Sequence, residues 1–74
     1  MIVCFLKHKG FLLKVYEQGS DLQCIVINKT GTKIIERWKT FYPSQKNVCV
    51  NVLVSDVLNE LKIFDFDLEE IVYT

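Results

Sequence analysis

The chain has 74 residues, half of them hydrophobic, and nine basic and nine acidic side chains give it a formal net charge of zero. This length accommodates one small domain, and the hydrophobic content excludes a disordered chain. The 3 Gly and 1 Pro exclude a collagenous or low-complexity protein. No apolar run approaches the roughly 18 residues that a membrane-spanning helix requires, so no membrane partner is expected.

Apolar runs separated by turn residues predict three strands in the first part of the chain. They are expected near 2–7, 11–18 and 22–28, because the abundant Val, Ile and Thr pack well on a pleated surface. Residues 7–10 and 19–21 supply the intervening turns. The third run has apolar residues on both faces, which predicts a strand covered on both sides.

A hairpin signal follows at residues 28–32, Asn-Lys-Thr-Gly-Thr, because Gly31 can adopt a positive φ. A fourth strand is expected near 33–41. Valines then recur at every second position and predict a fifth strand near 48–54. From Ser55 the spacing of apolar residues becomes helical.

A helix is therefore expected near 55–64, and Phe64 is expected to pack beneath the sheet. Residues 65–74 fit either a short strand or a helical turn, and an extended strand is favoured. The element order indicates an α+β fold in a single domain covering 1–74. It is a small antiparallel sheet or half-barrel of about five strands packed by one helix.

The three cysteines, Cys4, Cys24 and Cys49, lie inside apolar runs, and no Cys-x-x-Cys pattern is present. Reduced, buried thiols and a cytoplasmic location are the expectation. Residue types with AT-rich codons far outnumber those with GC-rich codons. This bias indicates an AT-rich genome, such as that of a low-GC bacterium, one of its phages or a large DNA virus, and is compatible with a phage- or mobile-element-encoded protein.

Catalytic chemistry finds little support in the sequence. His8 is the only histidine and stands in an expected turn, without the positioned partner that a general base needs. Residues 65–69 match the start of a calcium-binding loop, but Glu70 stands where that loop requires glycine. No enzyme activity, catalytic residue, metal site or cofactor is therefore expected.

The zero net charge hides a division along the chain. Residues 1–54 carry eight basic and three acidic side chains (+5), and residues 55–74 carry one basic and six acidic ones (−5). The two parts could simply lie against each other or form solvated faces. Alternatively, an acidic segment with apolar anchors can steer and bind a partner.

The first functional hypothesis is a non-enzymatic module that uses this acidic segment to bind and regulate another protein of unknown identity. Its expected contact residues are Asp65, Phe66, Asp67, Glu69, Glu70 and Tyr73.

A second hypothesis is a single-stranded nucleic-acid-binding module that combines basic and aromatic side chains. It is less favoured, because the neutral chain lacks a basic footprint and because Trp38 and Phe41 fall on opposite faces of one strand. A third hypothesis is an oligomeric structural or assembly subunit that buries its apolar surplus between copies. The residues expected for nucleic-acid binding are Lys29, Lys33, Arg37, Trp38, Lys39, Tyr42 and Lys46.

Overall fold

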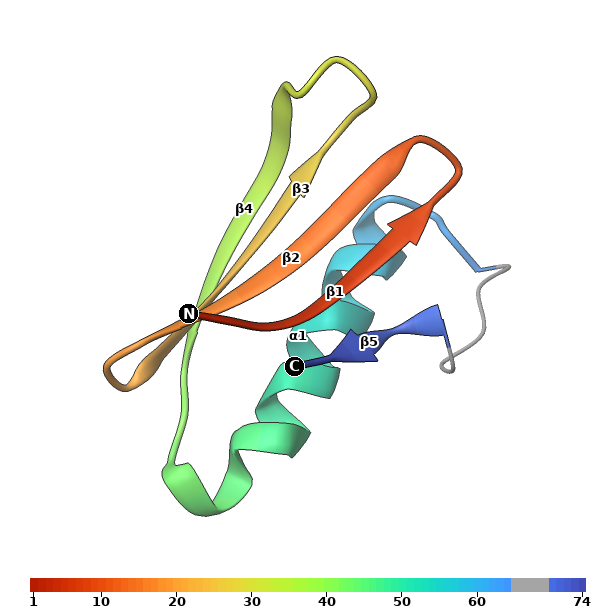
Figure 1. Cartoon of the computed structure of the whole chain (residues 1–74). Helices are drawn as coiled ribbons and strands as arrows, with labels where there is room; N and C mark the ends of the chain where they lie inside the picture. Colours follow the sequence, from red (N-terminus) through yellow and green to blue (C-terminus); the bar gives the residue numbers. More distant parts are fainter. Residues whose placement is uncertain (65–69) are drawn as a thin grey trace.

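The computed structural model describes residues 1–64 and 70–74. Figure 1 shows their elements, which follow the chain from the N-terminal strand to the C-terminal one. These are the strands β1 (Ile2–His8), β2 (Phe11–Gln18), β3 (Asp21–Ile27) and β4 (Lys33–Thr40), a short 3₁₀ helix η1 (Pro43–Gln45), the helix α1 (Lys46–Glu60), and the strand β5 (Val72–Tyr73).

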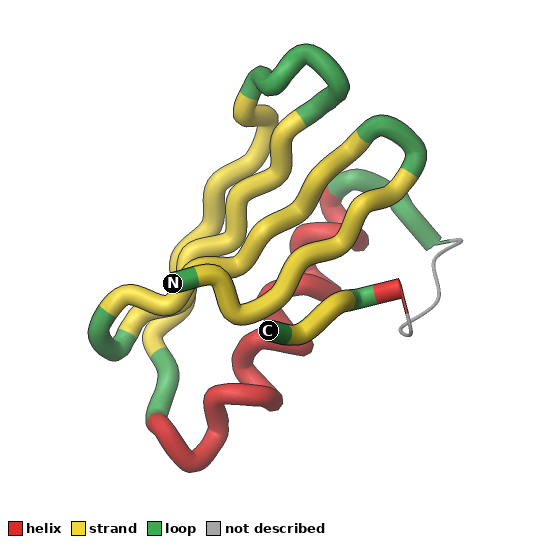
Figure 2. The backbone as a smooth tube through the Cα atoms, viewed as in Figure 1, coloured by secondary structure: helices red, strands yellow, loops and turns green. Residues whose placement is uncertain are grey.

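The sheet has the strand order β4-β3-β2-β1-β5, and all its neighbouring strands are antiparallel. The first four strands form a meander. The chain then crosses behind the sheet as α1 and returns at the opposite edge, where β5 pairs with β1 (Figure 1). Figure 2 shows α1 lying across one face of the strands. The expected α+β fold, a small antiparallel sheet packed by one helix, is confirmed.

The hydrophobic core lies between this sheet face and α1. The sheet contributes side chains at alternating positions, each at most 2% exposed, and the helix contributes a stripe at helical spacing. Phe41, Ile63 and Ile71 close the ends of this layer. The sheet residues that are at most 2% exposed are Cys4, Leu6, Leu13, Val15, Leu22, Cys24 and Val26, Val3 of β1 is also buried, and the helix stripe is Val50, Leu53, Val54, Val57 and Leu58.

The fifth strand expected near 48–54 is wrong, because these residues belong to α1. The alternating valines misled the prediction. Val48 and Val52 are exposed, whereas Leu53, which interrupts the alternation, is buried with Val54. Extending a helix by one residue requires less free energy than nucleating a new helix. The helix expected after Ser55 therefore extends toward its N-terminus and includes the valines.

The helix ends earlier than the expected 64, at Glu60. The amide of Lys62 donates to the Asn59 carbonyl and the amide of Ile63 to the Leu58 carbonyl, the pattern of a Schellman cap. Lys62 has a φ of 57° in this cap, a conformation that usually selects glycine. Beyond the cap, Phe64 is 71% exposed, so its expected packing beneath the sheet is wrong.

Two other local predictions are confirmed. The turn between β3 and β4 has Gly31 at a φ of 82°, and the Asn28 side-chain oxygen accepts hydrogen bonds from the amides of Thr30 and Thr32, each at 3.0 Å. Within 65–74, the favoured extended strand is present as β5, while residues 65–69 lie outside the described part of the chain. No helix in the described ranges is long and apolar enough to cross a membrane.

Candidate functional site

The sheet face opposite α1 is not covered by any element of the described residues. Strand pairing places there the side chains that alternate with the buried ones. We call this surface the open face. It consists of the apolar residues Phe5, Leu12, Tyr16, Ile25, Ile27 and Trp38, with Ile34 in the irregular stretch of β4 at its edge, and the polar residues Lys7, Lys14, Gln23, Lys33 and Glu36.

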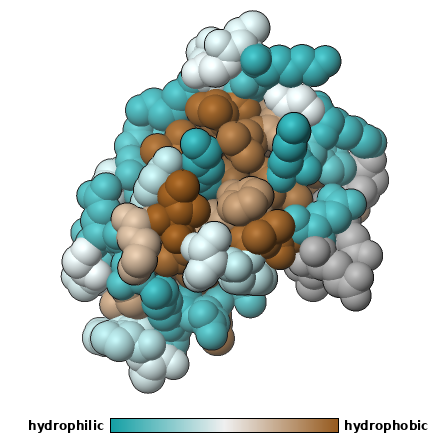
Figure 3. Space-filling model, viewed as in Figure 1, coloured by the Kyte–Doolittle hydropathy of each residue, from teal (hydrophilic) through white to brown (hydrophobic). Residues whose placement is uncertain are grey.

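The open face is apolar and accessible. Trp38 and Ile34 are 52% and 40% exposed, and the other apolar members are partly buried by their neighbours. Figure 3 looks onto this side of the molecule and shows hydrophobic side chains gathered over the strands with hydrophilic ones among them. A contiguous apolar surface of this kind marks an interaction site more often than a solvated face.

At its upper end, the open face continues into a hollow between the β1–β2 and β3–β4 turns. This hollow has a volume of about 380 Å³ and is lined in part by Lys7, Leu12 and Ile27. Lys29 lies over Gly10, where an added Cβ would come within 2.8 Å of the Lys29 side chain. The missing side chain at Gly10 therefore leaves room for the Lys29 side chain to lie across the first turn.

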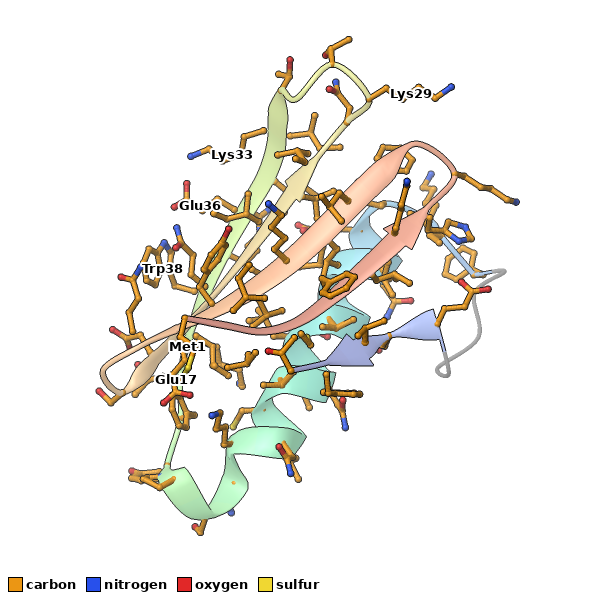
Figure 4. The ribbon with its side chains drawn as sticks, viewed as in Figure 1. Met1, Glu17, Lys29, Lys33, Glu36 and Trp38 are labelled. Atoms are coloured by element: carbon orange, nitrogen blue, oxygen red, sulfur yellow. The ribbon has the colours of Figure 1, made fainter. Side chains whose placement is uncertain are left out.

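One carboxylate on the open face is held by two neighbours. The Gln23 side-chain amide and the Lys33 ammonium each donate to Glu36 at 2.6 Å. The hydrogen bonds from Lys33 and Gln23 hold the pKa of Glu36 below its usual value. Figure 4 shows Lys33, Glu36 and Trp38 projecting from the same side of β4. The Glu36 carboxylate is therefore held in position beside an exposed tryptophan, with its charge paired by Lys33.

The residues expected for nucleic-acid binding are not brought together on one surface. Trp38 lies on the open face, whereas the pairing of Arg37 with Cys24 and of Lys39 with Leu22 places both cations on the helix side. Phe41 is 5% exposed, which confirms that one of the two aromatic residues, Trp38 or Phe41, belongs to the core. Lys29 lies in the β3–β4 turn, and Tyr42, beyond β4, is exposed.

Three of these cations have acidic partners. Lys33 contacts Glu36, Arg37 contacts Glu60 at 2.8 Å, and Lys46 contacts Glu17. The Arg37–Glu60 pair borders a shallow groove of about 330 Å³ between β4 and α1, which Lys39 and Asp56 also line. A cation held by a carboxylate has less attraction for a phosphate.

The acidic segment expected to bind a partner is described only at its end. Asp65, Phe66, Asp67 and Glu69 lie outside the described residues. Glu70 lies 3.5 Å from His8, and the Tyr73 hydroxyl donates to Asn51 at 2.6 Å. Partial burial raises the pKa of Tyr73. The contacts Arg37–Glu60 and His8–Glu70 bring the basic and acidic parts of the chain together at two places.

The remaining reactive groups are enclosed or dispersed. Cys4 and Cys24 are fully buried and form no disulfide, and burial raises their pKa values to about 11 and about 12. These thiols stay protonated and unreactive at neutral pH. Cys49 is partly buried on α1. Within residues 1–64 and 70–74, no three His, Cys, Asp or Glu side chains lie close enough to hold a metal ion.

Most of the open face was not singled out as a site by the sequence. The sequence feature that could have indicated it was the presence of apolar residues on both faces of the third run. That feature predicted a strand covered on both sides. The structure covers only one side, so that prediction is wrong for the described chain. Comparisons with protein families, with curated proteins and with solved structures find no match. The function is therefore inferred from the chain's own residues.

Proposed function

We propose that this protein is a non-enzymatic interaction module that binds another protein chain through its open face. The observation that supports this function is that one sheet face is packed by α1 while the other, equally continuous face presents seven apolar side chains to solvent. Leaving such a surface in water is unfavourable by about 25 cal/mol for each Å² of apolar area, and a bound partner removes that cost.

The composition of the open face suits a protein partner. Tyr16 and Trp38 are the residue types that most often dominate binding energy, because they bury a large area with little loss of conformational freedom. Lys7, Lys14 and Glu36 provide charges of both signs beside the apolar centre, which give specificity and orientation. The acidic residues 65–70 add a charge that steers association.

Site-specific photo-crosslinking tests this proposal. Ile34, exposed on the open face, is replaced by photoreactive benzoylphenylalanine, and Asn59, exposed on α1, is replaced in the matched control. After irradiation in an extract of the native host, we expect protein adducts at position 34 and none above background at position 59. Absence of adducts at 34, or equal adducts at both positions, contradicts binding through this face.

The acidic segment is tested separately by charge reversal at Asp65, Asp67, Glu69 and Glu70. If this segment steers the partner, the reversed variant forms the position-34 adduct more slowly and with a weaker dependence on salt. Unchanged adduct formation in low salt contradicts a steering role for the segment and leaves the open face as the contact.

A second candidate function is binding of single-stranded nucleic acid, and one observation favours it. Phe5, Tyr16 and Trp38 share the open face with Lys7 and Lys14, and aromatic side chains on a sheet can stack bases beside basic groups. Titration with a mixed single-stranded oligonucleotide pool in low salt decides between the two. We expect no measurable binding, and binding that falls steeply with added salt contradicts that expectation.

A further inference from the structure

The residues of the open face are complementary across β3. Strand pairing places β3 residues in register with β2 on one side and β4 on the other. Gln23 stands between Tyr16 and Trp38, and Ile25 stands between Lys14 and Glu36. At the next level, Ile27 pairs with Leu12 on one side and with Lys33 on the other, and Ile34 lies in the irregular stretch of β4 beside Lys33. Two levels therefore match across the central strand, one aromatic with aromatic and the other cation with anion.

We propose that the occupant of the open face is a second copy of this chain, packed sheet against sheet about a two-fold axis parallel to β3. This inference rests on the proposed function and names its partner. A two-fold axis over β3 places β2 of one copy against β4 of the other, and the same contact recurs at the symmetric position. Packed sheets align within about 30° and lie about 10 Å apart, so facing side chains meet in one layer.

This arrangement places matching side chains together at two levels of the face. Lys14 of one copy meets Glu36 of the second copy twice, and Tyr16 meets Trp38. Leu12 meets the side chain of Lys33, whose apolar stem can lie along it, while Gln23, Ile25 and Ile27 meet their own counterparts near the axis. Glu36 is already oriented by Gln23 and Lys33, so little ordering is needed to receive the additional cation.

A different axis does not match the charges. A two-fold axis that runs across the strands at the level of these residues brings each residue on the axis opposite its own copy. Lys14 then faces Lys14, or Glu36 faces Glu36. An axis between β2 and β3 places Lys14 against Ile25 and Phe5 against Glu36, which buries both charges without partners. The axis along β3 is the one among these that brings Lys14 of one copy opposite Glu36 of the other.

The expected dimer is weak. Three strands spaced by about 4.8 Å, with about six residues each at 3.3 Å, give a contact of roughly 300 Å² on each sheet. This lies below the roughly 800 Å² per partner of a standard interface. We therefore expect a dissociation constant in the micromolar range and a monomer–dimer equilibrium that responds strongly to single charges.

Charge exchange between copies tests the proposal. In a Lys14→Glu dimer, the introduced carboxylate would face Glu36 of the second copy twice, and in a Glu36→Lys dimer, the introduced ammonium would face Lys14 twice. Each variant alone should therefore dimerise about tenfold more weakly or worse. Mixing the two variants restores one attractive pairing at each of the two contacts, either between the original side chains or between the introduced ones. Sedimentation velocity from about 10 to about 500 µM should then show a heterodimer that is tighter than either variant's homodimer.

Lys7→Glu is the matched control, because Lys7 lies on the open face but on β1, outside the three strands that the axis brings into contact. It carries the same charge change, so it should dimerise like the wild type. Mixed with Glu36→Lys, it offers one attractive and one repulsive contact, so it should form a weaker heterodimer than Lys14→Glu does. Circular dichroism of each variant checks folding, and restored association in the mixture shows that both partners are folded.

A wild-type chain that stays monomeric at about 500 µM overturns the proposal. So does a dimer that Lys14→Glu weakens no more than Lys7→Glu, or two variants that fail to associate when mixed. If the chain is monomeric while position 34 still crosslinks to a different protein, the second copy is excluded and the proposed function stands. If position 34 captures nothing, both are excluded.

Discussion

Replacing one leucine on each sheet face by alanine measures how differently the two faces are packed. Leu22 on β3 is fully buried against α1, whereas Leu12 on β2 is half-buried on the open face. Loss of three buried carbon atoms at about 0.8 kcal/mol each, together with the cavity left behind, predicts a loss of about 3 kcal/mol for Leu22→Ala. Leu12 is already in contact with water, and Leu12→Ala should cost about 1 kcal/mol.

Urea unfolding at about 1 µM protein, below the expected dimerisation range, measures both losses. A domain of this size gains only about 3–5 kcal/mol from its core, so Leu22→Ala should lie close to its unfolding transition even without urea. With a slope near 1 kcal/mol per molar urea, Leu12→Ala should lower the midpoint by about 1 M. Equal losses for the two variants would refute the conclusion that only one sheet face is packed in the monomer.

Two further predictions concern one charge and one backbone conformation. The carboxyl of Glu36 should titrate below its usual pKa of 4.5, and Lys33→Met should move that pKa upward, as followed by carboxyl carbon NMR shifts. Because folding lowers this pKa, the contribution of Glu36 to stability is present above pH 4.5 and is lost as the pH falls through the pKa of the folded state. If the pKa of Glu36 does not move in Lys33→Met, the assigned cause is contradicted. Lys62→Gly should raise the free energy of unfolding by about 0.5–1 kcal/mol, because glycine adopts the observed φ of 57° without steric cost, and a decrease in a urea titration would count against the cap.

The sequence predicted the meander well because its signals are local. β2 occupies the expected 11–18, and the turn at 28–32 follows from the αL conformation of Gly31 and the side-chain hydrogen bonds of Asn28. The helix start was missed, because every-second-residue valines between 48 and 54 satisfied a strand pattern by coincidence. The true stripe, which includes Leu53 and Val54, is set by packing against the sheet.

The candidate site was harder to predict for a related reason. Apolar residues such as Ile25 and Ile27 on the second face of β3 indicate a second cover but do not say whether the chain supplies it. That answer depends on where α1 crosses the sheet, which is a tertiary property. The complementarity of Lys14 with Glu36 became visible only with the strand register, because these residues are adjacent in neither sequence nor strand pairing.

The pairing of β5 with β1 has a consequence for synthesis of the chain. β1 ends at His8, but its outer-edge partners, Val72 and Tyr73, are synthesised after every other described strand and helix. On the ribosome, the outer backbone amides and carbonyls of β1 therefore await their partners until almost the whole described chain has emerged. An unprotected strand edge can pair with another nascent chain, so chains on one polysome can misassemble through β1 until β5 pairs with Cys4 and Phe5.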